Sequence, residues 1–299
     1  MKHTIFLLAA TILMATSCRN GNTQVQTTDT PHDPVITITT KDGVSLLIKD
    51  NQPLIFGLVD KENEMPKELF LGSYNDTLLT SLMPTGASRS AINAFIAVDS
   101  LNTILFDAGL GADNGGHLLE KMKNAEFDPA KVTAVCLTHL HFDHIGGLLL
   151  NGHAAFPNAT LYLSQEEYDT WSDGGPLAKN NGMWKKVMEA YRGHIKTIHD
   201  GEELFNGMVV AKLAPGHTPG HTVYKVAGIC LIAGDLLHAQ DLQLDHPQFC
   251  ARYDTDPAQA VATRTRIFKS VRENGQYLAG AHCYEHFINL RDLSKGIKE

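Results

Sequence analysis

Short runs of β-branched and apolar residues predict two hairpins in the first third of the chain. The predicted strands cover residues 35–39, 44–48, 94–98 and 103–106. Lys41-Asp42-Gly43 supplies the turn of the first hairpin, and Asp107-Ala108-Gly109 follows the second. Gly and Asp suit such turns because they tolerate the backbone angles that a tight reversal requires.

From residue 115 onward, runs with a helical period of apolar residues alternate with short apolar runs that are typical of strands. Helices are predicted over residues 115–123, 165–171, 184–191 and 257–274. Strands are predicted over residues 132–137, 161–163, 209–213, 222–226, 229–233 and 277–279. Asp256-Pro257 is a typical helix start, because a carboxylate caps free N–H groups and proline suits the first turn. This order predicts an α/β fold in one domain, residues 34–299, with mixed sheets covered by helices.

The N-terminus is typical of a secretory signal. Residues 4–14 form an apolar run that is too short to span a bilayer. Small residues then lead to Cys18, as in a bacterial lipobox, although Ala15 stands where leucine is usual. We expect a signal peptide over 1–17, a flexible polar tether over 18–33, and an exported protein that is periplasmic or a membrane-anchored lipoprotein. Plain signal cleavage without lipidation is the alternative.

Export would expose the remaining cysteines to an oxidising compartment. Cys136 and Cys230 lie in apolar strand-like runs, where a free thiol packs as a small hydrophobic group. Cys250 and Cys283 allow a disulfide that the sequence alone does not establish. The net charge of −8, without clustered Lys and Arg, gives no reason to expect nucleic-acid binding.

The densest chemical signal follows the predicted strand 132–137. His139, His141, Asp143 and His144 are four candidate metal ligands within six residues. On an extended backbone His139 and His141 point to the same side, because the side-chain period of a strand is two. The turn that follows brings the other two within reach of a second position nearby. Imidazole and carboxylate together suit Zn²⁺ or a similar divalent ion.

This HxHxDH motif resembles the metallo-β-lactamase superfamily. Later segments resemble the other motifs of that family in the expected order, with His217 in a Pro- and Gly-rich loop, and Asp235 and His282 each directly after an apolar strand. The resemblance implies a four-layer αββα sandwich that binds two divalent metal ions, with zinc expected. It implies one ion held by His139, His141 and His217, a second held by Asp143, His144 and His282, and Asp235 bridging the two.

Other residues near these motifs have supporting roles by the same resemblance. Asp107 is expected to hydrogen-bond backbone near the site without binding metal, and His221 is expected to be structural. His286 is the alternative to His282 as the last ligand. His282 is favoured because it directly follows the strand, which is the more rigid position for a ligand.

Within the superfamily, the sequence is most similar to the methyl parathion hydrolase-like branch, near the quorum-quenching lactonases. The similarity lies in Phe156–Ala159, Gly234–His238 and Arg252–Ala260. Residues 283–287 depart from that branch, which has a Pro- and Phe-rich loop there. Because this loop is expected to face the substrate, the departure leaves the substrate open.

The resemblance implies a hydrolase in which a metal-bridging hydroxide attacks an ester, lactone or phosphotriester. The expected catalytic residues are Asp143, Asp235 and His238. His238 either donates a hydrogen bond to the substrate or leaving group, or only packs beside the site. The aromatic candidates for pocket walls, which plain core packing would equally explain, are Phe142, Trp171 and Trp184.

Other functions of the same fold fit the sequence less well. A β-lactamase of the usual kind lacks the bridging aspartate that Asp235 supplies. A glyoxalase II-like thioesterase needs a helical domain after the last histidine, and an RNA-processing nuclease needs a basic surface. A non-catalytic secreted metal-binding module is the alternative from another class. We expect a small-molecule substrate and membrane contact only through a lipid on Cys18. The sequence leaves the oligomeric state open, and a dimer is one alternative.

Overall fold

The computed structural model describes residues 36–50 and 52–291. The predicted signal peptide, the tether and Cys18 lie outside the described residues. Within these two ranges, no helix combines the length and apolar character that crossing a bilayer requires.

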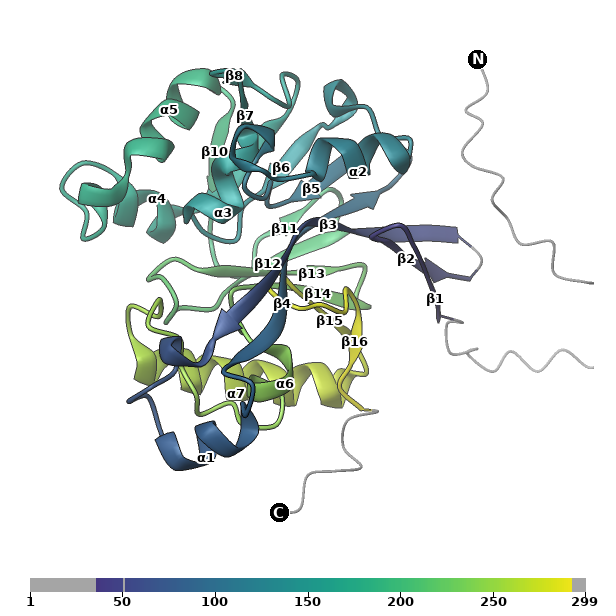
Figure 1. Cartoon of the computed structure of the whole chain (residues 1–299). Helices are drawn as coiled ribbons and strands as arrows, with labels where there is room; N and C mark the ends of the chain where they lie inside the picture. Colours follow the sequence, from purple (N-terminus) through teal and green to yellow (C-terminus); the bar gives the residue numbers. More distant parts are fainter. Residues whose placement is uncertain (1–35, 51, 292–299) are drawn as a thin grey trace, which may run out of the picture. The chain divides into compact units, whose positions relative to one another are not determined.

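Two sheets stack face to face (Figure 1). The larger sheet has eight strands in the spatial order β1 (Ile36–Lys41), β2 (Val44–Lys49), β3 (Gln52–Pro66), β4 (Ala87–Val98), β5 (Thr103–Phe106), β6 (Ala134–Cys136), β9 (Thr160–Ser164) and β10 (Ile195–Ile198). The smaller sheet has six strands, β11 (Glu203–Leu204), β12 (Val209–Leu213), β13 (Thr222–Val226), β14 (Cys230–Gly234), β15 (Tyr277–Gly280) and β16 (Ile288–Asn289). A separate ribbon joins β7 (Leu149–Leu150) to β8 (His153–Ala154).

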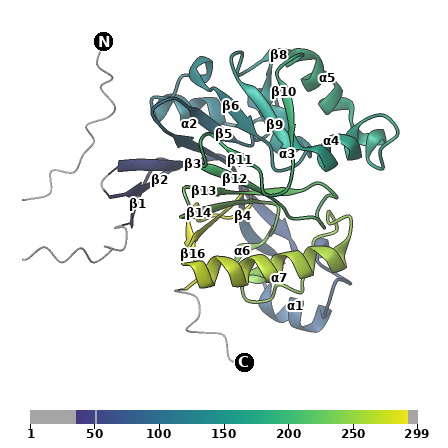
Figure 2. The same cartoon turned by 180° about the vertical axis from the view of Figure 1, so that it is seen from behind.

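Helices cover the outer face of each sheet. The α-helices of the described residues are α1 (Asp76–Leu82), α2 (Leu118–Asn124), α3 (Phe142–Ile145), α4 (Gln165–Trp171), α5 (Gly182–Ala190), α6 (Gln240–Gln243) and α7 (Pro257–Asn274). Residues of α2, α4 and α5 pack on the larger sheet, and α7 lies along the outer face of the smaller sheet (Figure 2). The layers therefore run helix, sheet, sheet, helix, which confirms the predicted αββα sandwich.

The apolar runs of the central strands are continuous because both of their faces are buried. In β4, Ala94 and Ile96 belong to the core beneath the helices, while Phe95 and Ala97 belong to the core between the sheets. Side chains of a strand point alternately to its two faces, so each strand supplies both cores. β14 repeats this pattern between the inter-sheet core and the core beneath α7.

The sequence pattern did not reveal β3, the long partner of β4. Four consecutive exposed residues, Lys61 to Glu64, interrupt its apolar period. Its backbone nevertheless pairs with β4 from Ile55↔Ala97 to Pro66↔Ala87. β4 itself begins seven residues earlier than the apolar run, because Ser90 and Asn93 are buried polar residues that bond to functional loops.

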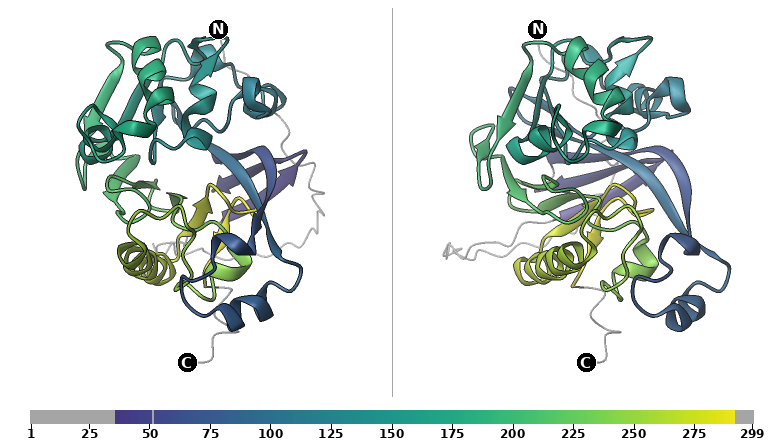
Figure 3. Two further views of the ribbon diagram at one scale, coloured as in Figure 1. Left: turned by 60° about the vertical axis from the view of Figure 1, so that its left-hand side comes forward. Right: turned by 90° about the vertical axis from the view of Figure 1, so that its left-hand side faces the viewer.

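The loops at one edge of the sandwich carry the candidate ligands. Figure 3 shows the two sheets and their helices from two further sides. β5 and β6 are parallel, and so are β14 and β15. The carboxyl ends of parallel neighbours lie at the same edge, so Asp107 is near His139, and Asp235 is near His282. Cys136, Cys230, Cys250 and Cys283 are free and buried, so the sandwich does not contain the Cys250–Cys283 disulfide.

Candidate metal centre

Three histidines from two loops direct their ring nitrogens at one point. His139 Nε2 lies 3.0 Å from His141 Nδ1 and 3.2 Å from His217 Nε2. His141 Nδ1 and His217 Nε2 are 2.9 Å apart. Donor atoms around a tetrahedral zinc ion, with bonds of about 2.0–2.1 Å, lie about 3.3 Å apart. The three nitrogens therefore have nearly the mutual spacing of ligands around one ion.

A second group lies beside the first and contains Asp143, His144 and His282. His282 Nε2 is 3.5 Å from Asp143 Oδ2, and His144 Nε2 is 3.9 Å from Asp143 Oδ1. His144 and His282 are buried, whereas the side chain of Asp143 is 30% exposed. Asp143 is thus the part of this group that solvent reaches.

Asp235 lies between the two groups and presents one carboxylate oxygen to each. Its Oδ2 is 3.2 Å from His217 Nε2 and 3.8 Å from His139 Nε2. Its Oδ1 is 3.0 Å from His144 Nε2 and 3.3 Å from His282 Nε2. All seven residues predicted as ligands therefore meet in one place, in the grouping that the sequence resemblance implied.

The backbone before Asp235 brings this carboxylate into position. Gly234 has a positive φ of 50°, and a Cβ there would lie 2.7 Å from both His221 Nε2 and Thr138 Oγ1. Only glycine accommodates such an approach. The Asp235 N–H donates to His221 Nε2 at 3.0 Å, while His221 Nδ1 contacts the carbonyl oxygen of Ala214. His221 is therefore structural, as expected.

Acceptors around the centre fix which nitrogen of each ring carries the proton. His217 Nδ1 donates to Asp254 Oδ1 at 3.0 Å, and His282 Nδ1 donates to the carbonyl oxygen of Ala91 at 2.9 Å. A neutral imidazole has a single N–H, so the Nε2 lone pair of each ring faces the centre. Such outer hydrogen bonds orient histidine ligands in metal sites.

Asp107 performs the same task for His144. Its Oδ2 accepts from His144 Nδ1 at 2.8 Å and from the Thr138 hydroxyl, and its Oδ1 accepts from the Thr138 N–H. Asp107 has a φ of 55°, a region that non-glycine residues rarely occupy. The expectation that Asp107 bonds backbone near the site holds, and Asp107 also orients a candidate ligand.

Burial and charge act in opposite directions on the ionisable groups. Burial lowers the pKa of His217 to about 3, so this ring is neutral and its lone pair is available. Burial also opposes protonation of His282, but the carboxylates of Asp235 and Asp143 outweigh it and raise the pKa of His282 to about 9. The second group therefore concentrates negative charge that attracts a cation.

The donor set fits divalent metal ions. Among the described residues, neither His144 Nε2 nor Asp235 Oδ1 makes a hydrogen bond, although both atoms are buried. Buried polar atoms without a partner are costly, and here they face one another across the ligand group. Imidazole nitrogens with carboxylate oxygens are the ligands that zinc and similar ions take in proteins.

The remaining predicted residues divide between the site and the core. His238 is buried beside the centre, with Nε2 3.2 Å from Asp235 Oδ2 and its ring stacked on His282. Phe142 is exposed next to the first group, and Trp171 lies edge-on to His141. Trp184 is not a pocket wall, because it is fully buried in the core beneath the helices.

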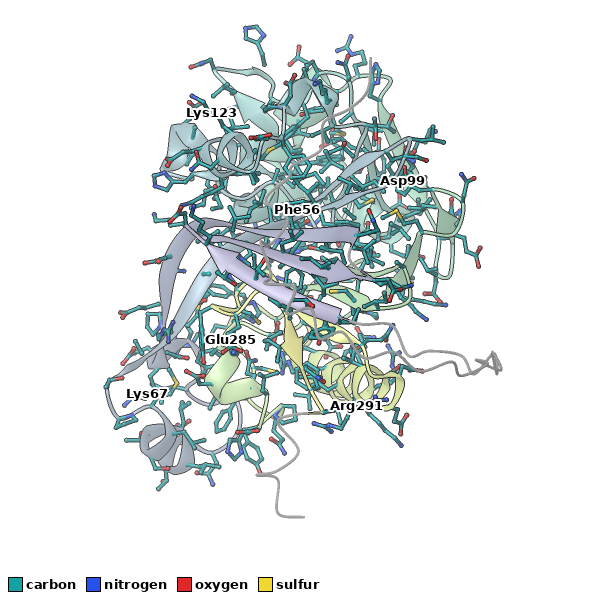
Figure 4. The ribbon with its side chains drawn as sticks, turned by 90° about the vertical axis from the view of Figure 1, so that its right-hand side faces the viewer. Phe56, Lys67, Asp99, Lys123, Glu285 and Arg291 are labelled. Atoms are coloured by element: carbon teal, nitrogen blue, oxygen red, sulfur yellow. The ribbon has the colours of Figure 1, made fainter. Side chains whose placement is uncertain are left out.

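The loop that departs from the related branch packs on α6. Gln240 Nε2 donates to Glu285 Oε2, and the Glu285 N–H donates to Gln240 Oε1, both at 3.2 Å. The Tyr284 hydroxyl donates a hydrogen bond to Asp241, which is also in α6. Glu285 is labelled in Figure 4. These bonds connect the segments that follow His282 and His238.

Three supporting residues escaped the sequence analysis. Asp254, Glu167 and Ser90 are far from the motifs in sequence, and each bonds to a loop that carries a candidate ligand. Asp254 also receives a contact from buried Arg264 at 3.4 Å. Asp254 lies in the segment Arg252–Ala260 that resembles the related branch. The sequence does not show the partner of any of the three residues, because these partners become neighbours only in the folded chain.

Comparison with known proteins agrees with this geometry. Residues 88–288 match the sequence profile of the metallo-beta-lactamase superfamily. The chain belongs to the metallo-β-lactamase superfamily. The N-acyl homoserine lactonase AttM of Agrobacterium fabrum is 30% identical over 118 residues, which are 36% of this superfamily member and 41% of AttM. The chain thus matches about two fifths of the length of that curated relative.

Solved structures of the superfamily show the same fold over nearly the whole domain. The hydrolase AbOPH superposes with a TM-score of 0.71 at 28% identity, covering 85% of this chain and 92% of that chain. AidC, a dizinc quorum-quenching lactonase in complex with a product, has a TM-score of 0.70 at 23% identity, covering 86% and 93%. The predicted similarity to the superfamily and to its lactonase-like members is confirmed.

His286, the alternative last ligand, lies away from the centre and makes stability depend on pH. Its Nδ1 is 2.6 Å from Ser45 Oγ, and burial lowers its pKa to about 4. Between about pH 6.5 and pH 4 the unfolded chain binds a proton here that the folded chain does not, so stability falls as pH falls through this window. The full effect is roughly 3 kcal/mol.

We expect His286→Asn to flatten this pH dependence, because asparagine does not titrate. Chemical denaturation at several pH values between 4 and 7 measures the free energy of unfolding. The result is the slope of this free energy against pH, because the smaller asparagine side chain will lower the stability at every pH. Equal slopes for the two proteins would show that His286 has the same pKa in the folded and the unfolded chain.

Proposed function

We propose that this protein is a binuclear metal-dependent hydrolase acting on small lactones, esters or phosphotriesters. The observation that carries the proposal is the position of Asp235. Its two oxygens face two separate groups of neutral or charge-balanced donors, as a carboxylate bridging two ions requires. The lactonase AttM supports lactones as substrates, and the hydrolase AbOPH supports a hydrolytic reaction.

His139, His141 and His217 would hold one ion, and Asp143, His144 and His282 would hold the other. Paired divalent ions supply Lewis acidity and lower the pKa of bound water from about 15.7 toward 7. The protein orients three of the ligand rings through their outer nitrogens, because Asp254 holds His217, Asp107 holds His144 and the Ala91 carbonyl oxygen holds His282.

Asp143, the carboxylate that solvent reaches, is the residue suited to transfer a proton. Burial raises the pKa of Asp143, but His144 and His282 outweigh it, so the pKa lies below its usual value and the group is ionised at neutral pH. A carboxylate Oδ of Asp143 can therefore accept a proton from the attacking water and pass it to the leaving oxygen. Asp235 is 4% exposed and is less suited to that exchange.

His238 is suited to donate a hydrogen bond to the substrate. It is buried, and among the described residues neither ring nitrogen makes a hydrogen bond, although Nε2 lies 3.2 Å from Asp235 Oδ2. Buried imidazoles normally satisfy at least one nitrogen, so an absent partner at this position suits a substrate oxygen. Its ring also contacts Tyr253, which is 48% exposed beside the centre.

Removing the bridging carboxylate tests the proposal. We expect Asp235→Ala to lose bound metal and to lower kcat/KM by more than about 100-fold, which exceeds the effect typical of residues that only support ligands. Metal analysis of the purified protein and a panel of N-acyl homoserine lactones, aryl esters, phosphotriesters and β-lactams measure both effects.

Asp245→Ala is the matched control, because Asp245 is an exposed carboxylate in the same segment. It should change neither metal content nor activity. Full activity of Asp235→Ala with one ion per chain would contradict a binuclear mechanism. Two bound ions in the wild-type protein with no hydrolysis of any panel compound would favour a non-catalytic metal-binding module.

A second substitution separates hydrogen bonding from packing at His238. His238→Phe keeps a ring that can stack on His282 but removes both nitrogens. We expect kcat to fall by about 100-fold, the lower range for a lost proton donor, with two ions still bound. Steady-state kinetics and metal analysis check this, and an unchanged kcat would assign His238 to packing alone.

A further inference from the structure

The geometry points to Glu167 as a positioning residue that sets the spacing of the first ligand group, His139, His141 and His217. Glu167 is not a candidate ligand and does not reach the centre. Its carboxylate instead bonds to both loops that carry these histidines. The inference rests on the metal centre of the proposed function, and it adds a residue outside the family motifs that controls one of the two ions.

Glu167 is fully buried and accepts four hydrogen bonds. Oε1 accepts from the Leu140 N–H at 3.0 Å and from Trp171 Nε1 at 2.7 Å. Oε2 accepts from the Thr218 hydroxyl at 2.6 Å and from the Gly220 N–H at 3.2 Å. Burying an ionised carboxylate is costly unless hydrogen bonds compensate, and here both oxygens are satisfied.

Three of the four donors come from the two ligand loops, and the fourth, Trp171, belongs to the same helix as Glu167. Leu140 lies between His139 and His141, while Thr218 and Gly220 follow His217. One rigid carboxylate therefore spans the gap between the two loops. The 2.9 Å separation of His141 Nδ1 and His217 Nε2 is the direct consequence at the site.

The helix that carries Glu167 docks tightly on the His217 loop. A Cβ on Gly220 would lie 2.0 Å from the Glu167 backbone nitrogen, so only glycine permits this approach. Ser164 caps α4 by accepting from the Glu167 N–H, and it donates to the Gly220 carbonyl oxygen at 2.6 Å. The position of Glu167 relative to the loop is thus set by backbone contacts as well as by its own side chain.

Trp171 extends the same support to the other loop. It lies one helical turn after Glu167, donates to Glu167 Oε1, and places its ring edge-on to His141 with 5.4 Å between ring centroids. In the described structure, His141 does not donate a hydrogen bond to an outer acceptor, as His217 and His282 do. Its orientation therefore depends on the backbone at Leu140 and on this ring.

Glutamine cannot replace Glu167 in this network. Its carbonyl oxygen satisfies two of the four donors, but its NH₂ group faces the other two. If NH₂ faces Thr218 and Gly220, the hydroxyl can rotate to accept, but the Gly220 N–H loses its partner. If the amide is flipped, the Leu140 N–H and Trp171 Nε1 lose theirs. Either way the substitution disturbs one loop while keeping the size of the side chain.

The test is the affinity of each ion, measured on the full-length chain by zinc titration against a chelating indicator. We expect Glu167→Gln to weaken one of two zinc equivalents by about 10–100-fold, as for other residues that orient ligands. The second equivalent should bind as in the wild type. With Co²⁺ as the probe, the visible absorption assigned to the first-filled equivalent should change in shape.

Glu166→Gln is the matched control, because Glu166 is the exposed neighbour of Glu167 in the same helix. It should leave both affinities unchanged. Trp171→Phe keeps the ring against His141 but removes one donor to Glu167, and it should weaken the same equivalent by a smaller factor. This variant tests the inference even if Glu167→Gln does not fold.

The outcomes separate this inference from the function on which it rests. Wild-type protein that binds fewer than two zinc ions would overturn the binuclear centre itself. Two ions in the wild type, with unchanged affinities in folded Glu167→Gln or, if that variant does not fold, in Trp171→Phe, would overturn only the role of Glu167. A lower thermal midpoint with both affinities intact would show that Glu167 stabilises the fold without positioning ligands.

Discussion

The site depends on one buried carboxylate that faces two groups of histidines. Asp235 is almost fully buried, and its two oxygens lie within 3.0 to 3.3 Å of nitrogens on His144, His217 and His282. A charge in such a position is stable only with compensating positive charge. Protonated histidines or metal cations can supply it, and the neutral imidazole of His217, with its lone pair directed inward, favours a metal cation.

The αββα architecture provides the precision that this arrangement needs. The strands before the HxHxDH run, Asp235 and His282 have their two faces buried in different cores, so these strands cannot shift without disturbing both. The loops are then secured by polar contacts rather than by packing. Asp107, Asp254 and Glu167 are buried acceptors that each bind a histidine or the backbone beside one.

Buried acceptors of this kind carry a cost that the fold offsets locally. Burial raises the pKa of Glu167 to about 7, although its four hydrogen bonds act in the opposite direction. The hydrogen bond from His217, together with the charge of Arg264, outweighs burial and lowers the pKa of Asp254 to about 2. The two residues support the same ligand, His217, one from each side of its loop.

The sequence determined the elements whose signals are local. The strand and helix periods, the Asp256 cap and the dense HxHxDH run need only neighbours within a few residues, so residues 209–213 and 257–274 match the observed strand and helix. Tertiary structure decided the rest. The second half of β3 is polar in sequence, and its pairing with β4 uses backbone groups. His286 is close to His282 in sequence yet contacts Ser45. Asp254 and Glu167 gain their partners only when distant loops meet. The local pattern of apolar residues predicts whether a side chain points to the core or to solvent. Which residue it then contacts depends on how the two sheets stack.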